Sequence, residues 1–118
     1  MNLSKHFARS EFACHCGCGF DVVDYELLTV LERVRERFDK PVVVTSGARC
    51  RAHNAAVGGS KSSQHIKGKA ADVQVEGVDP IDVYDFLNAY APEKYGLGLY
   101  QSWVHIDSRA KKARWNLA

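Results

Sequence analysis

The sequence predicts a single α+β domain in which helices flank a small, mainly antiparallel sheet. Three observations support this class: apolar residues recur at helical spacing in two segments, β-branched or alternating residues mark two strands, and a short two-stranded pattern lies near the C-terminus. The chain has 118 residues, of which 46% are hydrophobic and 25% are charged. This composition suits one domain over residues 1–118 that buries its own core.

The first half of the chain predicts a helix, a strand and a short second helix. Asp24 is a typical N-cap for a helix over residues 24–38, whose apolar residues recur every three or four positions: Leu27, Leu28, Leu31, Val34 and Phe38. The β-branched run 42–46 follows Pro41 and predicts a buried strand. A short helix is expected over 50–57, ending at Gly58 and Gly59.

The second half predicts a strand, a helix and a hairpin. Residues 70–75 alternate, with Ala71, Val73 and Val75 on one face and Asp72 and Gln74 on the other. Asp79 and Pro80 begin a helix whose apolar stripe is expected to be Ile81, Tyr84 and Leu87. Residues 96–100 and 103–107 predict two short strands joined around Gln101 and Ser102.

Three polar residues in these segments form a candidate metal site. Strand alternation places Trp103, His105 and Asp107 on one face, and His105 meets His65 and Asp72 if both strands share a sheet. Two imidazoles and one carboxylate leave the fourth zinc position open for water, as a catalytic site requires. Two alternatives stay open: Asp72 caps a neighbouring backbone group, or the His–x–Asp pattern at 105–107 binds iron.

Three roles stay open for the four cysteines: a metal site, a disulfide pair or reduced thiols. Cys14, Cys16 and Cys18 are clustered and Cys50 stands apart. Alternate residues of an extended chain point to opposite sides, and the usual C-x2-C spacing is absent, which argues against structural zinc. We expect the cluster to shape an N-terminal loop near the core and near Cys50, without binding the catalytic zinc.

Charge and hydropathy exclude some classes of protein. The formal net charge is +2 and the sequence pI is about 8.4, which is far from the dense basic face of a dedicated nucleic-acid binder. No apolar run approaches the roughly 18 residues of a membrane span, and the N-terminus lacks the apolar core of a signal peptide. We therefore expect a cytoplasmic monomer that binds neither nucleic acid nor membrane, and whose work outside the cell needs a holin-like route or a virion.

The motifs, taken together, resemble a known family. The segments "TSGARCRAHNAAVGGSKSSQHIKGKAADV", "GLGLYQSWVHID" and "ARW" are similar to the zinc D-Ala-D-Ala peptidases of the hedgehog/DD-peptidase fold, specifically the small murein peptidases of phages and bacteria. The resemblance implies zinc ligands at His65, Asp72 and His105. It also implies that Ser63 supports the loop or a substrate carbonyl, and that Arg49 binds a terminal carboxylate or the developing oxyanion.

The resemblance further implies hydrolysis of a peptide bond in the peptidoglycan stem or crosslink, by a carboxypeptidase or an endopeptidase such as a phage endolysin or tail-associated lysin. Several relatives carry an acidic residue three positions before the last histidine, where this chain has Ser102. Asp107 is therefore assigned as the catalytic base or as a partner that orients His105. Two other functions stay open: a non-catalytic zinc-binding module of the same fold, and a nucleic-acid-binding protein that uses the cysteine segment as a knuckle.

Overall fold

A computed structural model describes residues 2–118 and confirms the α+β class. Five strands form one sheet in the order β1-β2-β4-β3-β5. Neighbouring strands are antiparallel except β3 and β5, which run parallel. The bounds are Val42–Ser46 for β1, Ala70–Val75 for β2, Gly96–Leu99 for β3, Val104–Asp107 for β4 and Ala113–Asn116 for β5.

Three α-helices and two short 3-10 helices accompany the sheet. The α-helices are α1 (Tyr25–Phe38), α2 (Arg51–Ala56) and α3 (Pro80–Tyr90), and the 3-10 helices are η1 (Arg9–Phe12) and η2 (Gln64–Lys67). The Asp24 side chain accepts a hydrogen bond from the Leu27 backbone N–H, which confirms the expected N-cap of α1. None of the helices in the described part of the chain is both long and apolar enough to cross a membrane.

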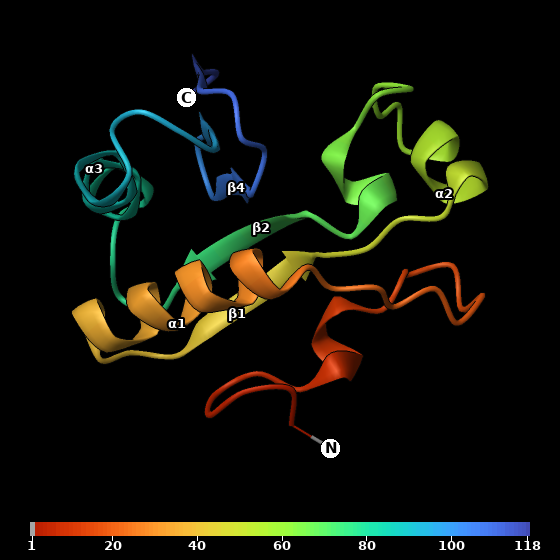
Figure 1. Cartoon of the computed structure of the whole chain (residues 1–118), viewed down its shortest axis with the longest axis horizontal. Helices are drawn as coiled ribbons and strands as arrows, with labels where there is room; N and C mark the ends of the chain where they lie inside the picture. The colour runs from red at the N-terminus through yellow and green to blue at the C-terminus, as the bar shows by residue number, and fades with distance from the viewer. Residues whose placement is uncertain (1) are drawn as a thin grey trace.

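The core lies on the face of the sheet that carries the apolar side chains of β2 and β4. Val73 and Ile106 are fully buried there and pack with Leu31 of α1 and Leu87 of α3. In Figure 1, α3 and α2 lie on opposite sides of the strands. Because side chains alternate along a strand, Asp72 and His105 point away from this core, toward the side of α2 and η2.

The apolar stripe of α3 differs from the sequence expectation. Leu87 is buried as predicted, but its buried partner is Val83, whereas Ile81 is 45% exposed and Tyr84 is only partly buried. Val83 and Leu87 are four residues apart and therefore share one face of the helix. The sequence shows which residues of α3 are apolar but not which side of the helix meets β3 and β4. The predicted stripe was therefore wrong by part of a turn.

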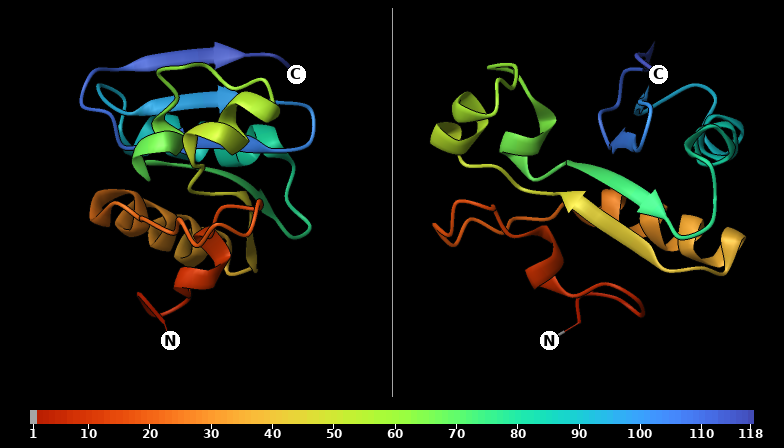
Figure 2. Two further views of the ribbon diagram at one scale, coloured as in Figure 1. Left: turned by 90° about the vertical axis from the view of Figure 1, so that its right-hand side faces the viewer. Right: turned by 180° about the vertical axis from the view of Figure 1, so that it is seen from behind.

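The C-terminal hairpin is confirmed, and it is extended by a strand that the sequence did not predict. Strands β3 and β4 pair with Gly98 opposite His105, and the Tyr100 backbone N–H donates to the Trp103 carbonyl at the turn. Strand β5 then pairs in parallel with β3, which places Trp115 beside Gly98. A Cβ at Gly98 would collide with the Trp115 indole nitrogen, so only glycine leaves room for this ring. Figure 2 shows β5 at the end of the molecule farthest from the N-terminal segment.

The N-terminal segment is fastened to α1 by one acidic side chain. Glu32 is largely buried and accepts hydrogen bonds from the Ser4 hydroxyl and from the His6 backbone N–H, the latter at 2.8 Å. The His6 ring lies 2.6 Å from the same carboxylate. His6 and Glu32 are 26 positions apart, so no local sequence pattern indicates this contact.

Candidate metal centre

His65, Asp72 and His105 converge on the face of the sheet opposite the core. Asp72 of β2 lies directly across from His105 of β4 in the antiparallel register. His65 belongs to η2, which precedes β2, and its ring centroid is 5.2 Å from that of His105. One ligand atom from each side chain lies within 4.8 Å of the others, so the structure brings together the three residues proposed as metal ligands.

The spacing of these atoms suits a small tetrahedral cation. His65 Nε2 and His105 Nδ1 lie 3.4 and 3.1 Å from the same Asp72 oxygen, Oδ1. A tetrahedral zinc ion with nitrogen and oxygen ligands holds neighbouring ligand atoms about 3.3 Å apart. The donor set and its geometry therefore fit zinc, with three protein ligands and one position left for water.

A hydrogen bond on the second ring nitrogen fixes the orientation of each histidine. His65 Nδ1 lies 2.7 Å from the Gly47 carbonyl oxygen, to which it donates, and this leaves Nε2 to face Asp72. His105 Nε2 lies 2.7 Å from Asp107 Oδ2, and this leaves Nδ1 to face Asp72. Metal-binding histidines are typically held in this way by a carbonyl or a carboxylate.

Asp107 is enclosed by its partners. Its side chain has no exposed surface and accepts hydrogen bonds from the Gly96 backbone N–H at 3.1 Å and from the Arg109 guanidinium at 2.8 and 2.7 Å. Together with the contact to His105, these bonds occupy both carboxylate oxygens. The carboxylate is therefore placed to orient His105 and is shielded from the cavity described below.

The electrostatics of the site favour a cation. Burial alone would raise the pKa of Asp72, but hydrogen bonds with His105 and His65 outweigh burial and hold the pKa well below its usual range. Burial acts in the same direction on Asp107, and hydrogen bonds with His105 and Arg109 again keep its pKa low. Both carboxylates are therefore ionised at neutral pH, on either side of His105.

A cavity of about 580 Å³ lies over the three ligands. Its wall includes Arg49 and Ser63, the two residues predicted to contact substrate. The Arg49 guanidinium lies 3.2 Å from Ser46 Oγ and 3.5 Å from Asp72 Oδ2, so it sits at the edge of the metal centre. Ser63 Oγ accepts from the His65 backbone N–H at 3.2 Å, which makes it the N-cap of η2 as well as part of the wall.

Aromatic residues form another part of the wall. The rings of Tyr100 and Trp103 stack with centroids 4.7 Å apart and an angle of 10° between them, and both residues line the cavity. Trp115 also lines it, with its ring centroid 5.0 Å from that of His105 and its indole N–H donating to the Tyr100 hydroxyl. The cavity therefore has an apolar side next to its charged centre.

Sequence reasoning missed the roles of Arg109 and Trp115. Arg109 lies two residues after Asp107, binds both of its oxygens and lies over the Trp115 ring at 5.5 Å. A basic residue two positions after Asp107, which was predicted to act next to His105, was the available signal for Arg109. For Trp115 the available signal was its place in the segment "ARW" of the resemblance, but its contacts were not visible because they depend on the parallel pairing of β5 with β3.

Comparisons with known proteins agree with this geometry. A family model described as Peptidase M15 matches residues 5–107, which include all three candidate ligands. A search of curated proteins found no match to the chain.

Proposed function

The chain belongs to the peptidase M15 family of metallopeptidases, and we propose that it is a zinc-dependent enzyme that hydrolyses a peptide bond in the stem or crosslink of peptidoglycan. The observation that carries the proposal is the convergence of His65, Asp72 and His105 at tetrahedral spacing beneath a cavity. Zinc held by these three side chains would supply a Lewis acid that activates water and polarises a carbonyl.

The protein's own residues divide the remaining work. Arg49 presents a planar guanidinium at the edge of the centre, where it can bind a substrate carboxylate or the oxyanion that forms as the peptide carbonyl is attacked. Ser63 fixes the turn that carries His65 and can offer its hydroxyl to a substrate carbonyl. Tyr100, Trp103 and Trp115 exclude water from one side of the cavity.

For Asp107, the geometry supports orientation of His105 rather than proton transfer. Its two oxygens are occupied by His105, Gly96 and Arg109, and no surface of its side chain faces solvent. A general base must reach the proton that it removes, directly or through one water. We therefore assign Asp107 as a positioning residue that acts through His105.

One observation favours a second candidate function. Among the described residues that line the cavity, Asp72 is the only carboxylate, and it is one of the three metal ligands in this proposal. A zinc site of this kind without a separate acid is also what a non-catalytic zinc-binding module would show. Activity on a defined substrate separates the two functions.

The test is digestion of purified peptidoglycan sacculi. Wild-type protein with zinc should release fragments whose masses and new amino termini identify a cleaved peptide bond, and a chelator should stop the release. His105→Ala should be inactive, whereas Asp82→Asn, a change at an exposed position of α3, should match the wild type. Zinc binding without any release of fragments would support the non-catalytic module instead. Release of glycan fragments alone would contradict a peptidase.

The same proposal includes where the enzyme works. By resemblance to the small murein peptidases, we propose a monomer that acts on the cell wall as a phage endolysin or tail-associated lysin, with stem peptides as its partners. The open cavity over the metal centre and the mild positive charge of +2 are compatible with an anionic polymer as substrate.

A further inference from the structure

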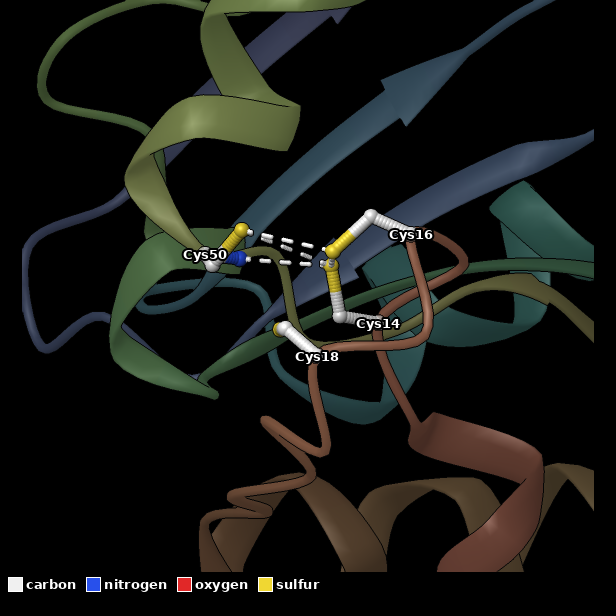
Figure 3. A group of neighbouring side chains, drawn as sticks. All are labelled: Cys14, Cys16, Cys18 and Cys50. Atoms are coloured by element: carbon white, nitrogen blue, oxygen red, sulfur yellow. Dashed lines mark hydrogen bonds between the residues drawn. The ribbon is translucent and has the colours of Figure 1, made fainter.

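A second cluster of metal-binding side chains lies outside the peptidase centre. The sulfur atoms of Cys14, Cys16, Cys18 and Cys50 all lie within 4.8 Å of one another, and all four thiols are free. In Figure 3, the side chains of Cys14 and Cys16 point toward Cys50, the residue just before α2, and Cys18 lies in the same N-terminal loop as Cys14 and Cys16. This cluster shares no residue with the set formed by His65, Asp72 and His105.

A tight turn explains how the three clustered cysteines converge. The Gly17 N–H donates to the Cys14 carbonyl at 3.2 Å, and the Cys14 N–H donates to the Phe20 carbonyl at 2.8 Å, so the chain reverses within a few residues. Gly17 and Gly19 have φ angles of +81° and +89°, which glycine adopts without strain. The expectation of an extended chain through residues 14–18 is therefore wrong. Without an extended chain, the C-x-C spacing no longer argues against a shared metal site.

The fourth cysteine reaches the loop through backbone contacts on either side of it. The Ala48 N–H donates to the Phe12 carbonyl at 2.8 Å, which holds the segment before Cys50 against η1. Cys50 is the N-cap of α2, and its sulfur accepts from the His53 N–H. The Cys50 N–H in turn points to the Cys14 sulfur at 3.4 Å. Backbone N–H groups that point at sulfur stabilise thiolate character, which metal ligation requires.

The distances between the sulfur atoms match a tetrahedral ion. Cys14 Sγ is 3.4 Å from Cys16 Sγ and 3.9 Å from Cys50 Sγ, and Cys16 Sγ is 3.6 Å from Cys50 Sγ. In a tetrahedral zinc site with four thiolates, neighbouring sulfur atoms lie about 3.8 Å apart. These three separations lie close to this value, and Cys18 Sγ lies within 4.8 Å of the other three sulfur atoms.

From this geometry we propose that Cys14, Cys16, Cys18 and Cys50 bind one zinc ion in a closed structural site, separate from the peptidase centre. Four protein ligands leave no open position for water or substrate, so the site stabilises and does not catalyse. It fastens the N-terminal loop to the residue that follows Arg49. The ion therefore helps to fix the segment from which Arg49 enters the cavity.

The test is the zinc content of purified full-length protein, compared among matched variants. Wild type should contain two zinc equivalents per chain and His65→Ala one. The double variant Cys16→Ser/Cys18→Ser, at two exposed positions, should also contain one. His15→Ala is the control, because it changes an exposed residue of the same loop and should keep both ions. The double variant should also unfold at a lower temperature than this control.

Cobalt substitution shows which ligands hold each ion. Cobalt in the cysteine site should give strong thiolate charge-transfer absorption in the near ultraviolet, which His65→Ala should keep and the double cysteine variant should lose. One zinc equivalent in wild type that disappears in His65→Ala would overturn the cysteine site and leave the proposed peptidase intact. Iron in place of zinc would also overturn the proposed zinc site. So would a thiol titration of the denatured, chelated protein that finds two thiols fewer than expected, because that result would indicate a disulfide.

Discussion

At the scale of single residues, the metal centre follows from the register of two strands. Asp72 and His105 face each other because β2 and β4 pair in antiparallel fashion, and alternation turns both away from the core. The sequence could supply this alternation and the candidate set of His65, Asp72 and His105, which the resemblance then implied as zinc ligands. It could not supply the contact of Arg109 with Asp107, since that contact depends on how the chain bends after β4.

The role of Asp107 leads to the first prediction. Asp107→Asn removes the charge that holds His105 through its second ring nitrogen, so zinc affinity should fall about 10- to 100-fold. Competition with a chelating dye measures this affinity, and turnover at saturating zinc should recover most of its wild-type value. If zinc affinity is unchanged and turnover is lost, Asp107 is the base and the assignment made here is wrong.

Arg49 gives the second prediction at this scale. Arg49→Lys keeps the positive charge but loses the planar fork, so turnover should fall on the order of 100-fold with zinc content and folding unchanged. Arg51→Lys makes the same change two residues away, at an exposed position of α2, and should leave turnover as in wild type. Equal rates for the two variants would show that Arg49 has no part in binding substrate or oxyanion.

At the scale of elements, the sequence predicted the helix and strand features that depend mainly on neighbouring residues. The N-cap at Asp24, the strand β1 and the alternation of β2 were visible in the sequence and are confirmed. The expected burial of β1 is wrong, because β1 lies at the edge of the sheet and Val43 is 51% exposed. Two features depend on contacts between distant segments and were not visible: the buried face of α3 and the existence of β5. Short sequences such as residues 113–116 become strands only when a partner such as β3 is present.

The contact between the N-terminal segment and α1 gives a prediction about stability. Burial alone would raise the pKa of Glu32, but hydrogen bonds from Ser4 and His6 and the charge of His6 outweigh burial and lower it. Glu32→Gln should therefore reduce the free energy of unfolding by about 1–3 kcal/mol near neutral pH. Chemical denaturation measures this difference, and Glu36→Gln, at an exposed position of the same helix, is the control.

The pH dependence follows from the direction of that shift. Because the pKa of Glu32 is lower in the folded protein than in the unfolded chain, its contribution is complete above the unfolded value of about 4.3 and is lost as pH falls through the folded value. Wild type and Glu32→Gln should therefore approach equal stability in acid. A difference that stays constant down to strongly acidic pH would show that the contact does not depend on the charge.

At the scale of the whole molecule, the two faces of the sheet have separate tasks. One face buries the apolar side chains that pack with α1 and α3, and the other holds the metal centre beneath the cavity formed with η2, the loop before it and β5. Fixed strands hold two of the three ligands, so the centre is organised before an ion binds, which favours binding. The cysteine cluster lies outside this centre and fastens the N-terminal loop to the start of α2.

A zinc titration of chelated protein in the peptidoglycan assay, with zinc occupancy and peptide release followed together, tests whether the zinc site performs the hydrolysis. For wild type, peptide release should be absent in the chelated protein and should rise with occupancy of the site formed by His65, Asp72 and His105. His105→Ala should fail to regain release over the same range of zinc. Full release by chelated wild-type protein, or recovery of His105→Ala at wild-type zinc concentrations, would show that zinc at this site does not perform the hydrolysis.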